Sequence, residues 1–191
     1  IYYTRMKTPK TKRLFLIVLF IIAFSERVLY DMGPNFELVT TALILSSFYA
    51  GKRASFWTVF LIMLFSDLII GNTNIFIFTW SGFLVPALFS KNLINKLSFL
   101  KSQHTKHRAP YTNKIFNSIS LTSTGLISNL FFFFWTNFGV WLISGMYPKT
   151  ATGLKMSYIN ALPFLKYQFI STLIFIPTVY MLTEMAIYLR K

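Results

Sequence analysis

The sequence contains no cysteine and only 5 acidic residues, against 19 lysines and arginines. Without cysteine the chain has no disulfides, no thiolate nucleophile and no cysteine-ligated metal cluster. Charge is scarce in general, because charged residues make up 13% of the chain whereas a soluble domain has about 25%. Apolar residues make up 54% and occur in long runs that a soluble core does not require. These features predict one integral membrane domain over residues 1–191.

Six apolar segments follow one another along the chain. They cover residues 14–25 with an extension to 30, then about 37–50, 54–70, 75–90, 122–144 and a last span within 160–189. We expect Pro163 and Pro177 to bend or break the last span. The second span is short, so we expect it to be tilted, re-entrant or covered by its neighbours. The predicted fold is an all-α compact bundle of about six transmembrane helices.

The basic residues lie between the apolar segments, and most of them fall on one predicted side. That side holds 15 of the 19, in residues 1–13, 52–53, 91–114 and 190–191, whereas the other side holds 4. Basic loops are retained in the cytoplasm, so both termini are predicted to be cytoplasmic, with residues 1–13 a basic N-terminus and 91–114 a basic loop. This placement predicts contact with the lipid bilayer rather than with nucleic acid, despite the net charge of +14. Met6 is the expected start of translation.

Polar and aromatic residues gather at the predicted outer ends of the spans. Asp67 precedes Gly71 by four residues, about 6 Å inside the end of its helix, and Asn137 and Trp141 share one helix face. Polar groups in hydrocarbon are costly unless they meet a partner, so they should face the protein interior or a ligand. We therefore expect an outward-facing cavity for a small molecule. The candidate binding residues are Arg27, Asn35, Asp67, Trp80, Asn137, Trp141, Tyr147, Lys149 and Asn160.

Each candidate also has a structural interpretation. Arg27 and Asp67 can neutralise each other, the tryptophans can belong to an interfacial aromatic belt, and Asn137 can bond another helix. The segment 147–150 can be an ordinary exposed loop. No metal site is predicted from His104 and His107, which have no acid or cysteine beside them. The sequence has no phosphate-binding glycine loop, zinc-protease motif or nucleophile elbow, so neither enzymatic activity nor a cofactor is expected.

Several short motifs combine into a family resemblance over residues 14–189. They are Arg27, Pro34-Asn35-Phe36, Ser66-Asp67 with Gly71, Thr136-Asn137-Phe138-Gly139-Val140-Trp141 and Tyr147-Pro148-Lys149-Thr150. With these motifs the chain resembles an uncharacterised bacterial family similar to the substrate-binding S component of energy-coupling factor (ECF) transporters. The resemblance implies a six-helix protein of the bacterial inner membrane that captures a small organic, vitamin-like molecule from outside. It also implies a transmembrane coupling subunit and two cytoplasmic ATPases as partners.

The leading hypothesis is therefore a substrate-binding subunit of a membrane transporter. Arg27 would contact an anionic group, Asp67 would balance Arg27 or bond a polar donor, and the two candidate tryptophans would stack on the ligand. Segments 26–37 and 145–155 would form a lid. The first span lacks the small-x-x-x-small seam by which S components contact their coupling subunit. The alternative is a non-catalytic scaffold of a multiprotein complex, with the basic segment 91–114 contacting acidic partners or lipid headgroups.

Overall fold

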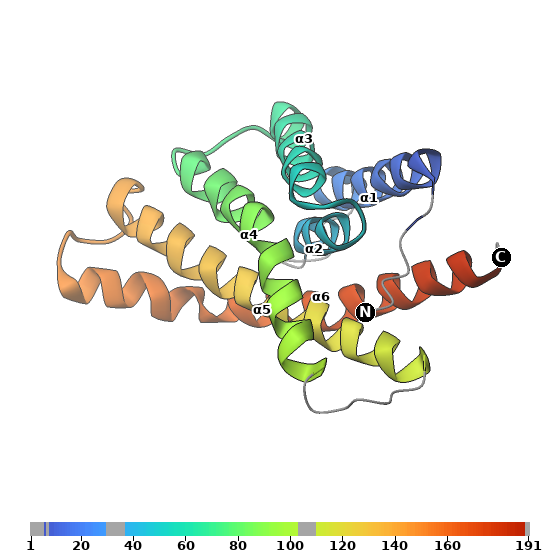
Figure 1. The fold of residues 1–191 in the computed structure, drawn as a ribbon. Helices are drawn as coiled ribbons and strands as arrows, with labels where there is room; N and C mark the ends of the chain where they lie inside the picture. Colours follow the sequence, from blue (N-terminus) through green and yellow to red (C-terminus); the bar gives the residue numbers. More distant parts are fainter. Residues whose placement is uncertain (1–5, 7, 30–36, 103–109, 190–191) are drawn as a thin grey trace.

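The computed structural model describes residue 6 and residues 8–29, 37–102 and 110–189, and these residues form six α-helices (Figure 1). The helices are α1 (Pro9–Leu29), α2 (Val39–Ala50), α3 (Lys52–Ile70), α4 (Phe76–Ser102), α5 (Pro110–Ile143) and α6 (Ala151–Leu189). The described residues contain no strand, which confirms the all-α class. Helices α3 to α6 are long and apolar enough to cross a membrane, which supports a membrane protein.

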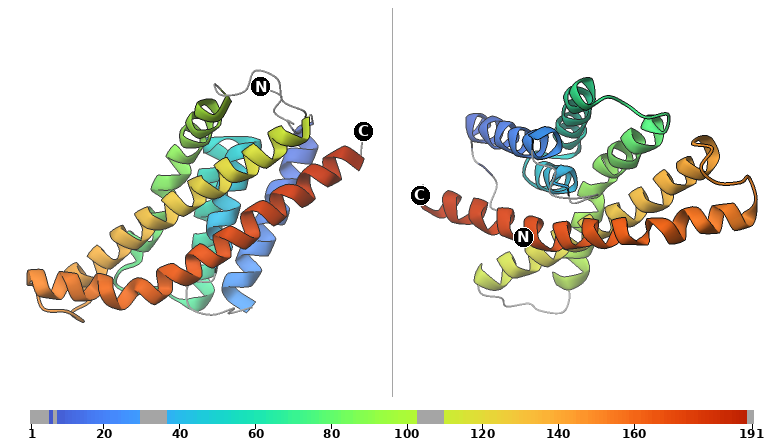
Figure 2. Two further views of the ribbon diagram at one scale, coloured as in Figure 1. Left: turned by 90° about the horizontal axis from the view of Figure 1, so that it is seen from below. Right: turned by 180° about the vertical axis from the view of Figure 1, so that it is seen from behind.

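Consecutive helices run in opposite directions, so their ends collect at two ends of the bundle (Figure 2, left). The α3–α4 and α5–α6 connections and the end of α1 lie at one end, which we call the connection end. The start of α1, the end of α6 and the turn between α2 and α3 lie at the other, which we call the terminal end. This alternation agrees with the two groups of loops predicted from the sequence.

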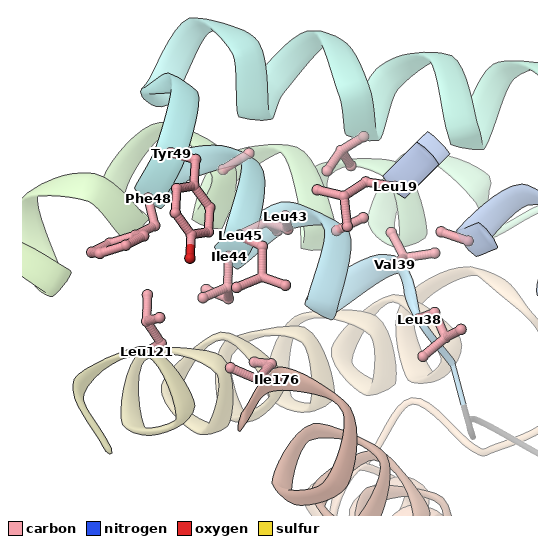
Figure 3. Close-up of a cluster of buried hydrophobic side chains, with 14 of the residues drawn as sticks. Leu19, Leu38, Val39, Leu43, Ile44, Leu45, Phe48, Tyr49, Leu121 and Ile176 are labelled. Carbon is pink, nitrogen blue, oxygen red and sulfur yellow. The ribbon is translucent and has the colours of Figure 1, made fainter. Parts of the chain in front are cut away.

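Helix α2 lies at the centre and packs against every other helix. Residues 39–49 are all buried, as expected of a helix that is apolar on every side. Its 12 residues span only about 18 Å, which is too short to cross about 30 Å of hydrocarbon. Side chains of α2 such as Ile44 lie between neighbours that include Leu19, Leu121 and Ile176 (Figure 3). Neighbouring helices therefore cover α2, one of the outcomes expected for the second span.

Several helices extend beyond the apolar segments. The prediction of a loop over residues 91–114 was wrong for most of its length, because α4 continues to Ser102 and α5 begins at Pro110. Lysine and leucine, which recur in residues 91–102, are good helix formers, so the basic and polar composition of this segment does not mark the end of a helix. The histidine pair of that segment lies outside the described residues.

Both ends of the chain show the same extension. Helix α1 starts inside the predicted basic N-terminus, with Pro9 at its first position and the Thr8 hydroxyl accepting a bond from Thr11 N (3.2 Å). Helix α6 starts at residue 151 rather than near 160, and neither Pro163 nor Pro177 breaks it. In a bundle of this kind, neighbouring helices and side chains can compensate the hydrogen bonds that a proline removes.

Glycines let α5 approach its neighbours closely. A Cβ atom at Gly139 would lie 2.3 Å from Cγ of Phe78 on α4, and one at Gly125 would lie 2.5 Å from Cδ1 of Ile176 on α6. These distances are shorter than van der Waals contact, so a side chain at either position would force its neighbour to move. Gly139 thereby sets the separation of α4 and α5 near the connection end.

Replacement of Gly139 by alanine should therefore destabilise the protein by about 1–3 kcal/mol, because the buried ring of Phe78 must move. Thermal unfolding in detergent measures the loss. The Phe78→Leu background is the control, since a smaller side chain should recover part of the loss. Equal losses in both backgrounds would show that the Gly139–Phe78 contact is not the cause.

Candidate functional site

The Asp67 carboxylate joins three helices near the connection end. Its Oδ1 pairs with Nη2 of Arg27 on α1 at 2.7 Å, and its Oδ2 accepts a bond from Nε1 of Trp80 on α4 at 2.7 Å. Arg27 Nε donates a further bond to Oγ of Ser66 at 2.7 Å. Asp67 is 7% exposed, whereas the Arg27 side chain is 22% exposed. These residues, which we call the Asp67 network, bring together three of the nine predicted positions.

The local sequence explains why each member of the Asp67 network lies where it does. Asp67 and Arg27 both occupy the last turn of their helices, and Gly71 ends α3 with φ +81°, donating its N–H to Asp67 O. A carboxylate is unfavourable at a helix C-terminus because the dipole is negative there, so a guanidinium from α1 compensates it. Trp80 is held in place edge-on by the rings of Phe60 and Phe76.

In the Asp67 network both oxygens of the carboxylate already accept protein donors, whereas the guanidinium has more N–H groups than its two bonds use. Each oxygen of the Asp67 carboxylate accepts a charge-assisted or indole hydrogen bond. Arg27 has five N–H groups, of which Ser66 and Asp67 receive two. The guanidinium is thus fixed by two bonds while part of its surface remains exposed, and it is a suitable donor for an anionic group.

Four other predicted residues form a second group around the α5–α6 connection, two in the connection and one on each adjoining helix. Trp141 Nε1 donates to Pro148 O at 3.0 Å, and Asn160 Nδ2 donates to Tyr147 Oη at 3.2 Å. Lys149 Nζ donates to the main-chain oxygens of Trp141 and of the next residue, in the last turn of α5. A lysine in this position satisfies carbonyls at the helix C-terminus. The contacts within this group, which we call the hairpin group, account for its residues as parts of a tight turn.

Helix α4 separates the hairpin group from the Asp67 network. Trp80 faces α3, whereas Phe78 lies on the other side of α4 and contacts the rings of Trp135 and Phe138 on α5. Among the described residues, no hydrogen bond, ion pair or ring contact joins the two sets. Asn137 belongs to neither, since its Nδ2 donates to Phe133 O one turn earlier in α5 (2.7 Å). Asn35 lies outside the described residues.

A buried polar cluster beside the start of α2 was not predicted as a site. Glu26 on α1 accepts a bond from Leu38 N at 3.1 Å, and Ser171 on α6 donates to Glu37 O at 2.6 Å. Asn129 on α5 contacts Thr40 and both Gln168 and Thr172 of α6. The sequence signal was available, because Asn129 is one of only two amides inside the apolar segment 122–144 and Glu26 and Glu37 are two of only five acids.

A further acid is buried toward the terminal end. Glu184 on α6 accepts a bond from Tyr49 Oη at 2.9 Å and lies 3.8 Å from Nζ of Lys114 on α5. The acidic side chains that the structure describes are therefore each hydrogen-bonded to another residue of the protein. They do not form a metal site, because the described residues contain no group of three or more histidine, aspartate or glutamate side chains that could hold an ion.

The Trp80–Asp67 bond can be tested by stability. Trp80→Phe keeps the ring but removes the N–H, leaving a buried carboxylate oxygen without that donor, and should cost about 1–3 kcal/mol. Trp57→Phe is the matched control because Trp57 lies on α3 with 57% of its surface exposed. Chemical or thermal unfolding in one detergent compares both variants with the wild type. Equal effects of the two substitutions would contradict a structural role for the indole N–H.

Comparisons with known proteins give one assignment. No curated protein and no solved structure matches the chain. A family model matches residues 7–190, which include all six helices and both sets of predicted site residues. The chain therefore belongs to DUF6580, a family of unknown function.

Proposed function

We propose that this protein is a substrate-binding subunit of a membrane transporter that captures a small organic molecule carrying an anionic group. The observation that supports this function is the fixed and partly exposed guanidinium of Arg27 at the connection end. Ser66 and Asp67 orient the Arg27 fork, and planar N–H groups in that arrangement match a carboxylate or phosphate in two-point contact. Trp80 adds an aromatic surface beside it, as small-molecule sites often have.

The connection end faces the outside of a bacterial plasma membrane in this proposal. Lys52 and Arg53 begin α3 at the terminal end, and the start of α1 at the same end carries three further basic residues. Cytoplasmic ends of membrane proteins are enriched in such residues. Both termini are then cytoplasmic, and Arg27 is accessible to molecules that arrive from outside.

The likeness to S components of ECF transporters is part of the proposal. A six-helix bundle with three connections at the ligand side is the arrangement that this likeness implies. A coupling subunit and ATPases would then contact the protein from the membrane and the cytoplasm. Helix α1 presents exposed Leu14, Ile17 and Ile21, an apolar stripe that a membrane partner or lipid can cover.

The second candidate function is a non-catalytic scaffold in a membrane complex. It is favoured by the Asp67 carboxylate, because each of its two oxygens already accepts a hydrogen bond from a protein donor. It is also favoured by the hairpin group, whose bonds are internal to the α5–α6 connection. In that function Arg27 and Asp67 fasten α1 to α3, and the protein holds no small molecule.

Replacement of Arg27 by lysine separates the two functions. Lysine keeps the charge that pairs with Asp67 but loses the fork, so a captured anion should bind at least about tenfold more weakly, which corresponds to about 1.4 kcal/mol. Native mass spectrometry of the protein purified in mild detergent should show a bound small molecule in the wild type and reduced occupancy in Arg27→Lys.

Arg53→Lys is the matched control, because Arg53 is exposed at the terminal end and should leave occupancy unchanged. Equal occupancy in Arg27→Lys and wild type would exclude Arg27 from the binding site. A wild-type protein that is reproducibly empty but retains protein partners would favour the scaffold.

The proposed orientation can be tested with single cysteines, since the chain has no cysteine of its own. Met146→Cys places a thiol in the α5–α6 connection, where the residue is 72% exposed, and Lys52→Cys places one at the exposed start of α3. A membrane-impermeant maleimide should label residue 146 in intact spheroplasts and residue 52 only after lysis. The reverse pattern would place the connection end in the cytoplasm.

A further inference from the structure

A chain of close oxygen and nitrogen contacts joins the start of α2 to α5 and α6. Oε1 of Glu37 lies 2.9 Å from Oγ1 of Thr40, which lies 3.0 Å from Oδ1 of Asn129. Asn129 Nδ2 donates to Gln168 O at 3.1 Å and to Thr172 Oγ1 at 2.7 Å. Thr40 and Asn129 are 2% and 1% exposed, so these contacts are shielded from solvent.

The number of hydrogen atoms available to this series of contacts depends on whether Glu37 is protonated. Both hydrogens of Asn129 Nδ2 are used, so its Oδ1 is an acceptor that faces Thr40. The Thr40 hydroxyl has one hydrogen but contacts two acceptors if Glu37 is ionised. A protonated Glu37 donates to Thr40, and Thr40 then donates to Asn129. Only the acid form of Glu37 supplies a hydrogen for each contact.

The charges around Glu37 favour the same form. Glu26 on α1 contributes a second negative charge, and the opposing charge of Arg27 is already paired with Asp67 at 2.7 Å. The cluster residues from α5 and α6 are uncharged: Asn129, Gln168, Ser171 and Thr172. Oε2 of Glu37 is buried and receives no hydrogen bond from any described residue. An ionised carboxylate in this setting is costly, because Oε2 is shielded from water and receives no hydrogen bond from the described residues in its place.

The acidity of this carboxyl agrees with the geometry. Glu37 precedes α2 and lies outside the four candidate membrane spans. Burial raises the pKa of Glu37 from 4.5 to about 8, and the charge of Glu26 acts in the same direction. A hydrogen bond from Thr40, the charge of Arg27 and the backbone N–H of Val39 favour the ionised form and oppose the rise of the pKa, but the effect of burial is larger.

We propose that Glu37 is a proton-binding site that is occupied at neutral pH, and that the bound proton fastens the start of α2 to α5 and α6. This inference does not depend on the proposed capture function. Loss of the proton leaves two acceptors for one Thr40 hydrogen and adds a buried negative charge near Glu26. The contact of α2 with α5 and α6 then weakens as the pH rises.

The sign of the pH dependence follows from the two states of the chain. The unfolded protein releases the Glu37 proton near pH 4.5, whereas the folded protein keeps it to about pH 8. Between these values the folded state holds one more proton, so stability falls as pH rises and becomes level above about pH 8. Glu37→Gln carries a permanent hydrogen-bond donor, and we expect this part of the pH dependence to disappear in that variant.

The direct test is carboxyl NMR of the full chain with ¹³C at the glutamate side-chain carboxyl carbon. The chain has three glutamates, so three signals can be followed through a pH titration. We expect one signal with a midpoint near pH 8 that is absent from Glu37→Gln. Glu184→Gln is the matched control, because Glu184 is also buried but belongs to the terminal end, and it should leave that signal unchanged.

Assignment does not require the Glu37 variant to fold. Glu26→Gln and Glu184→Gln identify the other two signals, and Glu37 follows by elimination. A Glu37 signal that titrates in the ordinary glutamate range, near pH 4.5, would overturn the proposal. Persistence of the pH-dependent stability in Glu37→Gln between pH 4.5 and about 8 would overturn it as well.

Discussion

Charged side chains from other helices form hydrogen bonds with the backbone at both ends of the buried helix α2. The rest of the bundle depends on this arrangement. Glu26 on α1 accepts the N–H of Leu38 at the start of α2, and Lys91 on α4 donates to Phe48 O in its last turn at 2.9 Å. The signs match the helix dipole, with an anion at the N-terminus and a cation at the C-terminus. A 12-residue helix cannot reach water at both membrane surfaces, so protein groups must satisfy the backbone that water would otherwise satisfy.

The charged residues beside α2 also decide how the outer helices pack. Glu26 and Arg27 are consecutive on α1, and they bond in two directions: Glu26 to the start of α2 and Arg27 to Asp67 on α3. One turn of α1 therefore fixes the relative positions of three helices. Buried ion pairs add little net stability over apolar packing, but they penalise every arrangement that separates the charges. In this bundle, the Arg27–Asp67 pair therefore specifies one register of α1 against α3.

The helix count, the all-α class and the burial of the second span follow from apolar runs and loop charge, which depend on composition over many residues. The helix ends did not follow, because residues 91–102 are polar and basic but keep good helix propensity, so α4 continues through them. Arg27, Asp67 and Trp80 could be selected because polar residues are rare within the apolar spans and gather at their predicted outer ends. Whether Trp141 or Lys149 joined them depends on the rotation of α4 and α5 about their axes. A single sequence does not encode that rotation in any local pattern.

The same reasoning explains why the Glu37 cluster is easier to interpret than to predict. Its members come from α2, α5 and α6, and Thr40 and Asn129 are 89 residues apart in the chain. Each is unremarkable alone, since a threonine or an amide in a membrane helix commonly bonds a neighbouring backbone. Once the three helices are placed, hydrogen counting leaves one form of Glu37 that satisfies all the contacts. Glu26 of this cluster and Arg27 of the Asp67 network are adjacent on α1, so the two polar groups meet at one turn of that helix.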